Sequence, residues 1–400
     1  MSLSTSQSRE QPVPQSLWNR GFVAATAILF VIFCNMAVFF QFYEYLHRLA
    51  VSPRWAGFII GVFALVALVI RPFISPWLTP FNARRWLDLG TLGVVASLLL
   101  YNLALTPWSL MVVRVLHGTA YVVMATAGMA ALVAMIPPER SGQAFGIMAV
   151  VTLLPYAMLP PLVVAASSHL GSFLRVLNLT ALMMLLILPL ARLMPLPRAD
   201  DGSRPPERLR WHDIKEDLSD RRILGLLLAS LLVFTAFTPV FYFIKTYAAK
   251  LGIANAGWFF TLSTGTEIAV RVVGGRYFDR GSKTRLLGGS LLVLAVSYLG
   301  LSLVSGHALF FTLAVGLGLG WGVALPMLNS LMFDLSQPRF RALNANLGLE
   351  MFQGGFFLGP SLGAWVLACW SYEALFAACA AACLAALLFL PMIRKGAPAS

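Results

Sequence analysis

Long apolar runs alternate with short polar connections along almost the whole chain. Each run has about 20 residues, which is the length that a helix needs to cross a bilayer. The runs are continuously apolar, unlike the alternating strands of a membrane barrel. The pattern therefore predicts an all-α integral membrane protein with twelve transmembrane helices, at 21–46, 54–78, 86–104, 108–136, 143–167, 173–195, 223–247, 254–275, 285–304, 308–333, 344–369 and 372–393.

The composition supports this prediction and narrows the partners. Hydrophobic residues make up 59% of the 400 residues and charged residues only 11%, whereas about a quarter of a soluble domain is charged. So few charges cannot cover such an apolar core in water, so the lipid bilayer is the expected surrounding. The net charge of +13 lies in short clusters between apolar runs rather than on one face, so no nucleic-acid partner is expected.

The basic residues predict which side of the membrane faces the cytoplasm. Only five of the 29 Lys and Arg residues fall in the loops of one side, namely Arg48, Arg54, Arg175, Lys245 and Lys250. Nearly all the others lie on the side that carries both termini, which is therefore predicted to be cytoplasmic. The first 20 residues are polar and are expected to be a cytoplasmic tail rather than a signal peptide. The chain is expected to lie in a bacterial inner membrane and to cross it many times.

The chain repeats itself at an offset of 200 residues. Gly57 falls on Gly257, and Gly118 on Gly318, while a third pair is found at Pro160 and Pro360. The shared offset predicts two six-helix halves of the same orientation, which is the plan of many secondary transporters.

The segment 196–222 separates these halves and is rich in proline and charge. It is interpreted as a solvated cytoplasmic linker, with which a short surface helix around 211–218 is compatible. The predicted organisation is a tail at 1–20, a bundle at 21–195, this linker, a bundle at 223–393 and a tail at 394–400.

Four short motifs carry a family resemblance. "GGRYFDRGSKTR" from Gly274, "RVLHGTAY" from Arg114, "GGFFLGPSLG" from Gly354 and "ERSGQAFG" from Glu139 resemble motifs of the major facilitator superfamily. Over nearly its whole length the chain is similar to this family, and within it to twelve-span bacterial drug and metabolite efflux permeases. The first half departs from the loop motif, because Thr79 stands where the family has Asp.

The resemblance implies a transporter whose halves rock around a site near the middle of the bilayer. It also implies a cytoplasmic gate, for which the candidate residues are Arg71, Gly275, Asp279, Arg280 and Asp334. Asp334 is expected near Arg339 and Arg341 at the membrane surface.

Charged residues inside spans are the informative ones, because each costs about 2.5–3.5 kcal/mol to insert. The candidates for proton coupling are Glu267, Glu44, Glu350, Arg114 and Arg271. Glu267 and Arg271 are four residues apart and share a helix face, so they form either a packed pair or a pair that breaks on protonation. Glu267 leads, because Ala67 occupies the equivalent position in the first half.

Two of these candidates have alternative interpretations. Arg114 either holds an anionic group or pairs with backbone carbonyls at a helix end. Glu44 either binds protons beside aromatic rings or lies solvated among the outer headgroups with His47 and Arg48.

Polar and aromatic residues in the central spans are candidates for lining a substrate cavity. They are Asn35, Gln41, His117, Tyr121, Tyr242, Lys245, Thr264, Trp321 and Gln353. Together with Phe39, Phe40 and Phe42 of the first span and Phe243 of the seventh, they favour a mostly apolar or amphiphilic substrate, although such rings more often face lipid or the core.

The sequence favours transport over catalysis. It contains no phosphate-binding GxxxxGK[ST] loop, no visible catalytic constellation and no metal-ligand spacing among its four cysteines. We therefore expect a non-enzymatic monomer without cofactor, driven by the proton gradient, that exports a small amphiphilic molecule. Proton symport of a small metabolite into the cell is the first alternative, and a membrane receptor is the second.

Overall fold

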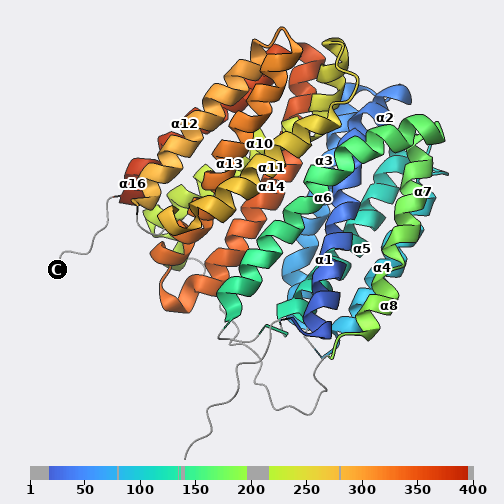
Figure 1. Cartoon of the computed structure of the whole chain (residues 1–400), viewed down its shortest axis with the longest axis horizontal. Coiled ribbons are helices and arrows are strands. Elements are labelled where there is room, and N and C mark those ends of the chain that lie inside the picture. Colours follow the sequence, from blue (N-terminus) through green and yellow to red (C-terminus); the bar gives the residue numbers. More distant parts are fainter. Residues whose placement is uncertain are drawn as a thin grey trace, which may run out of the picture.

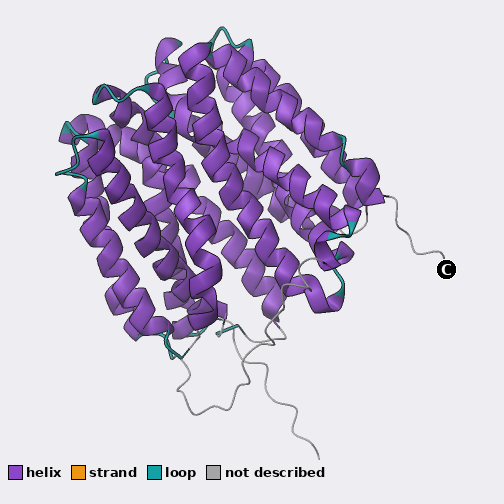
Figure 2. Ribbon diagram, turned by 180° about the vertical axis from the view of Figure 1, so that it is seen from behind, coloured by secondary structure: helices purple, strands orange, loops and turns teal. Residues whose placement is uncertain are grey.

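A computed structural model of the chain describes residues 18–78, 81–133, 135–136, 140–195, 216–278 and 281–394. Throughout these ranges the regular elements are helices and no strand occurs (Figure 2). The all-α fold class predicted from the apolar runs is confirmed.

The first half begins with α1 (Arg20–Val38), which continues through a tight turn at Phe39–Gln41 into α2 (Phe42–Arg48). After it come α3 (Pro53–Ile74), α4 (Ala83–Leu100), α5 (Pro107–Val133), α6 (Ser141–Leu170), α7 (Phe173–Met184) and α8 (Ile187–Arg192). The second half contains α10 (Arg221–Lys250), α11 (Gly257–Phe278), α12 (Lys283–Ser302), α13 (His307–Leu335), α14 (Arg341–Cys369), α15 (Tyr372–Leu387) and α16 (Leu390–Arg394).

Ten helical stretches of the described chain are long and apolar enough to cross a membrane. Three of them combine neighbouring helices, namely α1 with α2, α7 with α8, and α15 with α16. The two remaining predicted spans correspond to α4, which begins with Arg84, Arg85 and Asp88, and to α11, which contains Glu267 and Arg271. The arrangement is therefore consistent with twelve spans, and these two are the most polar.

The two halves lie beside each other, the first coloured blue to green and the second yellow to red (Figure 1). Because successive spans alternate in direction, the bundle has two ends. We call the end that carries Arg20, Arg221 and Arg394 the terminal side, and the end that carries the connections 49–52 and 251–256 the far side.

The repeat predicted from the sequence is visible in helix packing. Gly118 of α5 lies against Phe63 of α3, and 200 residues later Gly318 of α13 lies against Ser263 of α11. Likewise α1 packs on α6 as α10 packs on α14, and α4 packs on α5 as α12 packs on α13. Equivalent helices therefore make equivalent contacts in both halves.

The halves meet through α3 with α14 and α6 with α11. Near the far side Gly57 lies against Pro360, and its counterpart Gly257 lies against Pro160, so closely that a side chain at either glycine would collide with backbone. Toward the terminal side lies a groove of about 470 Å³ between α6 and α11. Its lining residues are Gln143, Gly146, Ile147, Ala149, Val150, Val151, Arg271 and Val272. The boundary is thus tightly packed at the far side and parted near the terminal side.

The end of the linker is bound to the second half. Asn344 of α14 donates a hydrogen bond from Nδ2 to Oδ1 of Asp217 (3.1 Å), and Arg339 forms an ion pair with Glu216 (3.1 Å). The linker was predicted to be solvated, but Asp217 is buried, so this part of it is packed against the second half. Residues 196–215, with most of the expected surface helix, lie outside the described residues, and so do nearly all of the two tails.

Candidate functional site

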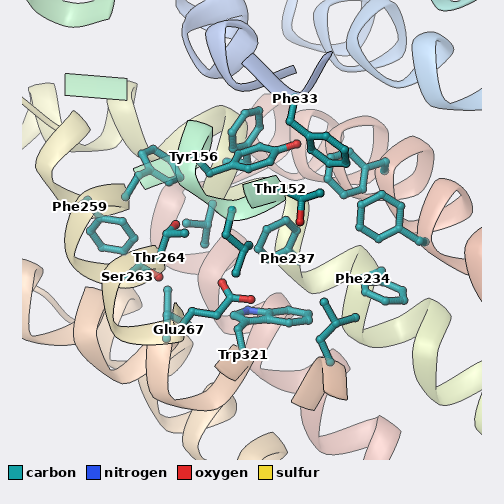
Figure 3. Close-up of a pocket in the computed structure, with 18 of the residues that line it drawn as sticks. Phe33, Thr152, Tyr156, Phe234, Phe237, Phe259, Ser263, Thr264, Glu267 and Trp321 are labelled. Atoms are coloured by element: carbon teal, nitrogen blue, oxygen red, sulfur yellow. The ribbon is translucent and has the colours of Figure 1, made fainter. Parts of the chain in front are cut away.

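A cavity of about 170 Å³ lies between the halves and belongs mostly to the second (Figure 3). From the first half it is lined by Phe33, Thr152, Leu153 and Tyr156. From the second half it is lined by Phe234, Phe237, Val240, Phe241, Phe259, Phe260, Ser263, Thr264, Glu267, Arg271, Tyr298, Leu317, Trp321, Leu325, Phe352 and Phe356. More than half of these residues are aromatic.

Helical spacing gathers the rings on one side. Phe234, Phe237 and Phe241 recur every three or four residues of α10 and therefore share one face. Trp321 of α13 stacks on Phe234, with centroids 6.1 Å apart and planes 15° apart, and meets Phe237 edge to face at 4.8 Å. Its Nε1 donates to the hydroxyl of Tyr298 (3.3 Å), which fixes the indole plane.

Glu267 brings a carboxylate into these aromatic surroundings. Its side chain points into the cavity, in the direction of Trp321 (Figure 3). Its Oε1 accepts a hydrogen bond from Nη2 of Arg271, one turn further along α11, and the two residues form an ion pair. Helix α11 packs closely on α13, because Gly318 and Gly322 of α13 have no side chains to keep the two helices apart.

The first half contains a buried cation outside the cavity. Arg114 is only 1% exposed; it donates from Nε to the carbonyl of Ile59 (3.4 Å) and from Nη2 to that of Ile60 (3.3 Å). Three phenylalanine rings surround its guanidinium at 4.7 Å each, Phe39, Phe42 and Phe63. In the part of the chain that the structure describes, Arg114 has no carboxylate partner. It contacts backbone carbonyls, as one interpretation expected, but these lie in the interior of α3 rather than at a helix end.

Polar candidates of the first half form a network beside Arg114. Nε2 of His117 lies 3.1 Å from Nδ2 of Asn35, and its Nδ1 lies 3.4 Å from the hydroxyl of Tyr101. Tyr121 packs on Phe63 at 5.1 Å. These side chains are buried, and none of them lines the central cavity.

Glu44 and Lys245 meet across the boundary at the far side. The Lys245 ammonium of α10 forms an ion pair with Glu44 of α2, and Arg48 pairs with the other carboxylate oxygen at 2.6 Å. Beside them Tyr43 and Phe243 pack edge to face at 4.4 Å. Lys245 was predicted to line the cavity, but it contacts Glu44 instead. Glu44 is therefore paired with two cations, Lys245 and Arg48.

The remaining cavity candidates also lie elsewhere. Gln41 accepts a hydrogen bond from Ser167 at the far end of α6 (3.1 Å). Tyr242 is buried against Phe241, with ring centroids 4.9 Å apart. Gln353 is buried in α14 and does not line the cavity.

The terminal side contains the candidates for a gate. Arg71 of α3 acts electrostatically on Glu350 of α14 across the boundary, but the two form no ion pair, and Oε2 of Glu350 is buried without a hydrogen bond. Asp334, near the end of α13, forms an ion pair with Lys283 at 2.6 Å. Asp279 and Arg280 lie outside the described residues, and so do the surroundings of Gly275.

The cavity thus combines four of the predicted site residues, Glu267, Arg271, Thr264 and Trp321. Sequence analysis missed the rings of Phe234, Phe237, Phe352 and Phe356. Their three- and four-residue spacing in α10 and α14 is a signal that could have found them. No group of three His, Cys, Asp or Glu residues in the described ranges is placed to hold a metal ion.

Comparison with solved structures supports the fold. The nucleoside transporter NupG superposes with a TM-score of 0.75 at 14% identity, covering 94% of this chain and 99% of that one. A bacterial homologue of the human lysosomal transporter Spinster, described as inward-facing and unoccupied, gives 0.75 at 15%, covering 95% and 96%. The peptide transporter POT in complex with sulfate gives 0.71 at 17%, covering 95% of each chain.

Sequence comparison then assigns the family. No curated protein matches the chain in sequence. The model of the Major Facilitator Superfamily matches residues 22–347 and again residues 251–400, so both halves are covered. The chain therefore belongs to the major facilitator superfamily and is a membrane transporter of that family.

Proposed function

We propose that the protein exports a small amphiphilic molecule in exchange for protons, by alternating access. The observation that carries this proposal is the central cavity, because its described lining combines one carboxylate, that of Glu267, with mostly aromatic side chains. Aromatic walls suit an apolar or amphiphilic molecule, and proton transfer is one of the roles that acidic residues inside membrane spans perform.

The packing between the halves supports alternating access. Gly57 against Pro360, Gly257 against Pro160 and the Glu44–Lys245 pair close the far side. We infer that Arg71 and Glu350 form an ion pair when the halves close at the terminal side. One cross-boundary pair would then break as the other forms.

The direction of transport rests on the distribution of basic residues. With the terminal side in the cytoplasm of a bacterial inner membrane, the parted side of the bundle faces the cell interior. Substrate enters the cavity from there, and protons reach Glu267 after the halves rock.

A second candidate is proton symport of a metabolite, and Arg271 in the cavity wall is the observation that favours it. NupG and POT, which share the fold, are nucleoside and peptide transporters by name. A polar metabolite would need several hydrogen-bond partners, yet the lining offers mainly rings beside the hydroxyls of Thr152, Ser263 and Thr264.

The test is transport into inverted membrane vesicles with an imposed pH gradient, using a panel of amphiphilic compounds. We expect uptake that depends on the gradient and dissipates it. Glu267→Gln should abolish this coupled flux, whereas Glu373→Gln, outside the cavity in the first turn of α15, should retain it. Normal pH-driven flux in Glu267→Gln would exclude Glu267 from the mechanism.

A further inference from the structure

The surroundings of Glu267 indicate a substrate class, and this inference rests on the proposed function. Only Oε1 of Glu267 is hydrogen-bonded, to Arg271. Oε2 has no hydrogen bond within the described ranges and is not enclosed by protein, so it faces the cavity that the side chain lines. We propose that this oxygen binds a monovalent organic cation that carries an aromatic ring, and that one such cation is exchanged for one proton.

The rings around the carboxylate support a cation. The face of an aromatic ring is electron-rich and attracts a positive charge within about 6 Å of its centroid. Phe237 and Trp321 lie on one side of Glu267 and Phe259 on another (Figure 3). A ligand ring would also stack among these side chains, so both parts of an aromatic cation find partners here.

The charges in the lining make the cation and the proton compete. Glu267 and Arg271 are its charged residues, and Tyr156 of α6 and Tyr298 of α12 are its other titratable groups. Helices α10, α13 and α14 contribute apolar and aromatic side chains only. When Glu267 is ionised, the pair is neutral and Oε2 accepts a cation; when it is protonated, Arg271 leaves the cavity positive and repels one.

An anionic substrate predicts the opposite behaviour. It would bind Arg271 and require a protonated Glu267, so its affinity would rise as the pH falls. Two observations disfavour it: ring faces repel anions, and Arg271 also lines the groove between α6 and α11, away from the aromatic walls. The sign of the pH dependence therefore separates the two classes.

The test is equilibrium binding to the purified protein in detergent, where no gradient exists. The probes are naphthylmethylammonium, naphthylmethanol and naphthylacetate, which share one ring system and differ in charge. Calorimetry from acidic to mildly alkaline pH should show the ammonium compound binding about 10-fold or more tightly than the alcohol. Its affinity should rise with pH, while that of the alcohol stays constant. Tighter binding of naphthylacetate, or ammonium affinity that is flat or falls with pH, would overturn the proposal.

Variants assign the effect to Glu267. Glu267→Gln should reduce ammonium binding to the level of the alcohol or below it, because Arg271 is then unpaired, whereas Glu267→Asp and Glu373→Gln should keep the preference. Unchanged alcohol binding and melting temperature show that Glu267→Gln is folded; if it still prefers the ammonium compound, the carboxylate is not the site.

The binding test also separates this proposal from the proposed function. Binding of the cation as predicted, without pH-driven transport in vesicles, refutes the transport mechanism and leaves the site intact. Proton-coupled transport of neutral or anionic compounds, without ammonium binding, refutes the substrate class alone.

Discussion

Gly257 of α11 lies directly against Pro160 of α6, and the same contact recurs 200 residues away between Pro360 of α14 and Gly57 of α3. In both places the nearest atoms include the backbone of the proline-containing helix. The two halves therefore meet at the far side in the same contact twice. A side chain added at either glycine would clash with backbone, and no movement of neighbouring side chains could remove that clash.

Gly257→Ala should separate α6 from α11 at the far side. The added methyl group would meet backbone atoms of Pro160 and Pro161, and such overpacking costs about 1–3 kcal/mol. We expect a lower melting temperature and a larger spin-label distance between the far ends of the two helices. Gly265→Ala, in the same helix but with open space around it, should instead stabilise by about 0.5–1 kcal/mol. Equal stability of the two variants would contradict the close contact.

Arg114 should not tolerate lysine. Its planar guanidinium contacts three rings and two carbonyls at once, and a compact, strongly hydrated ammonium cannot reproduce this. Arg114→Lys should destabilise the protein by about 1–3 kcal/mol, and Arg114→Met should do so less, since no buried carboxylate loses its partner. The check is unfolding in detergent; a lysine variant as stable as the parent would argue against the enclosure.

Reversing the charge of one member of the Glu44–Lys245 pair should open the far side, whereas reversing both charges together should be tolerated. Glu44→Lys places like charges beside Lys245 and Arg48 and should open the far side. Adding Lys245→Glu restores attraction and should close it again, with an effect of about 1 kcal/mol because both side chains are partly exposed. The measurement is the distance between spin labels at Leu49→Cys and Leu251→Cys, with the exposed Cys369 replaced by serine. An unchanged distance in Glu44→Lys would show that the ion pair does not hold the far side closed.

Two aspartates outside the membrane spans should give opposite pH dependences of stability. Hydrogen bonds from Arg222 lower the pKa of Asp220 below 3.8, so its contribution is present above that pH and is lost as the pH falls. Burial raises the pKa of Asp217, so stability declines as the pH rises from 3.8 through the raised pKa.

The two substitutions that follow test these signs. Asp217→Asn should raise the melting temperature at neutral pH, whereas Asp220→Asn should lower it there and have little effect in acid. Glu216→Gln, an exposed neighbour, serves as the control. A stabilised Asp220→Asn at neutral pH would contradict the assigned hydrogen bonds.

The apolar runs were sufficient to predict the helices, and the shared offset of Gly57 and Gly257 was sufficient to predict the repeat. Both depend on local composition and on spacing along the chain. Glu267 and Arg271 were found together because they occupy one helix. The Glu44–Lys245 pair and the network of Asn35 and His117 depend on which helices become neighbours, and a single sequence does not encode that in any local pattern.

The pairing of Glu267 with Arg271 has an electrical consequence. A membrane voltage does work on any net charge that moves through it, about 2.3 kcal/mol per elementary charge for each 100 mV. In the proposed exchange, the two residues and a bound cation together carry one positive charge outward, and with Glu267 protonated they carry one positive charge back. The voltage therefore assists one limb of the cycle as much as it opposes the other. If one cation is exchanged for one proton, as proposed, the cycle is therefore electroneutral and is driven by the pH difference alone.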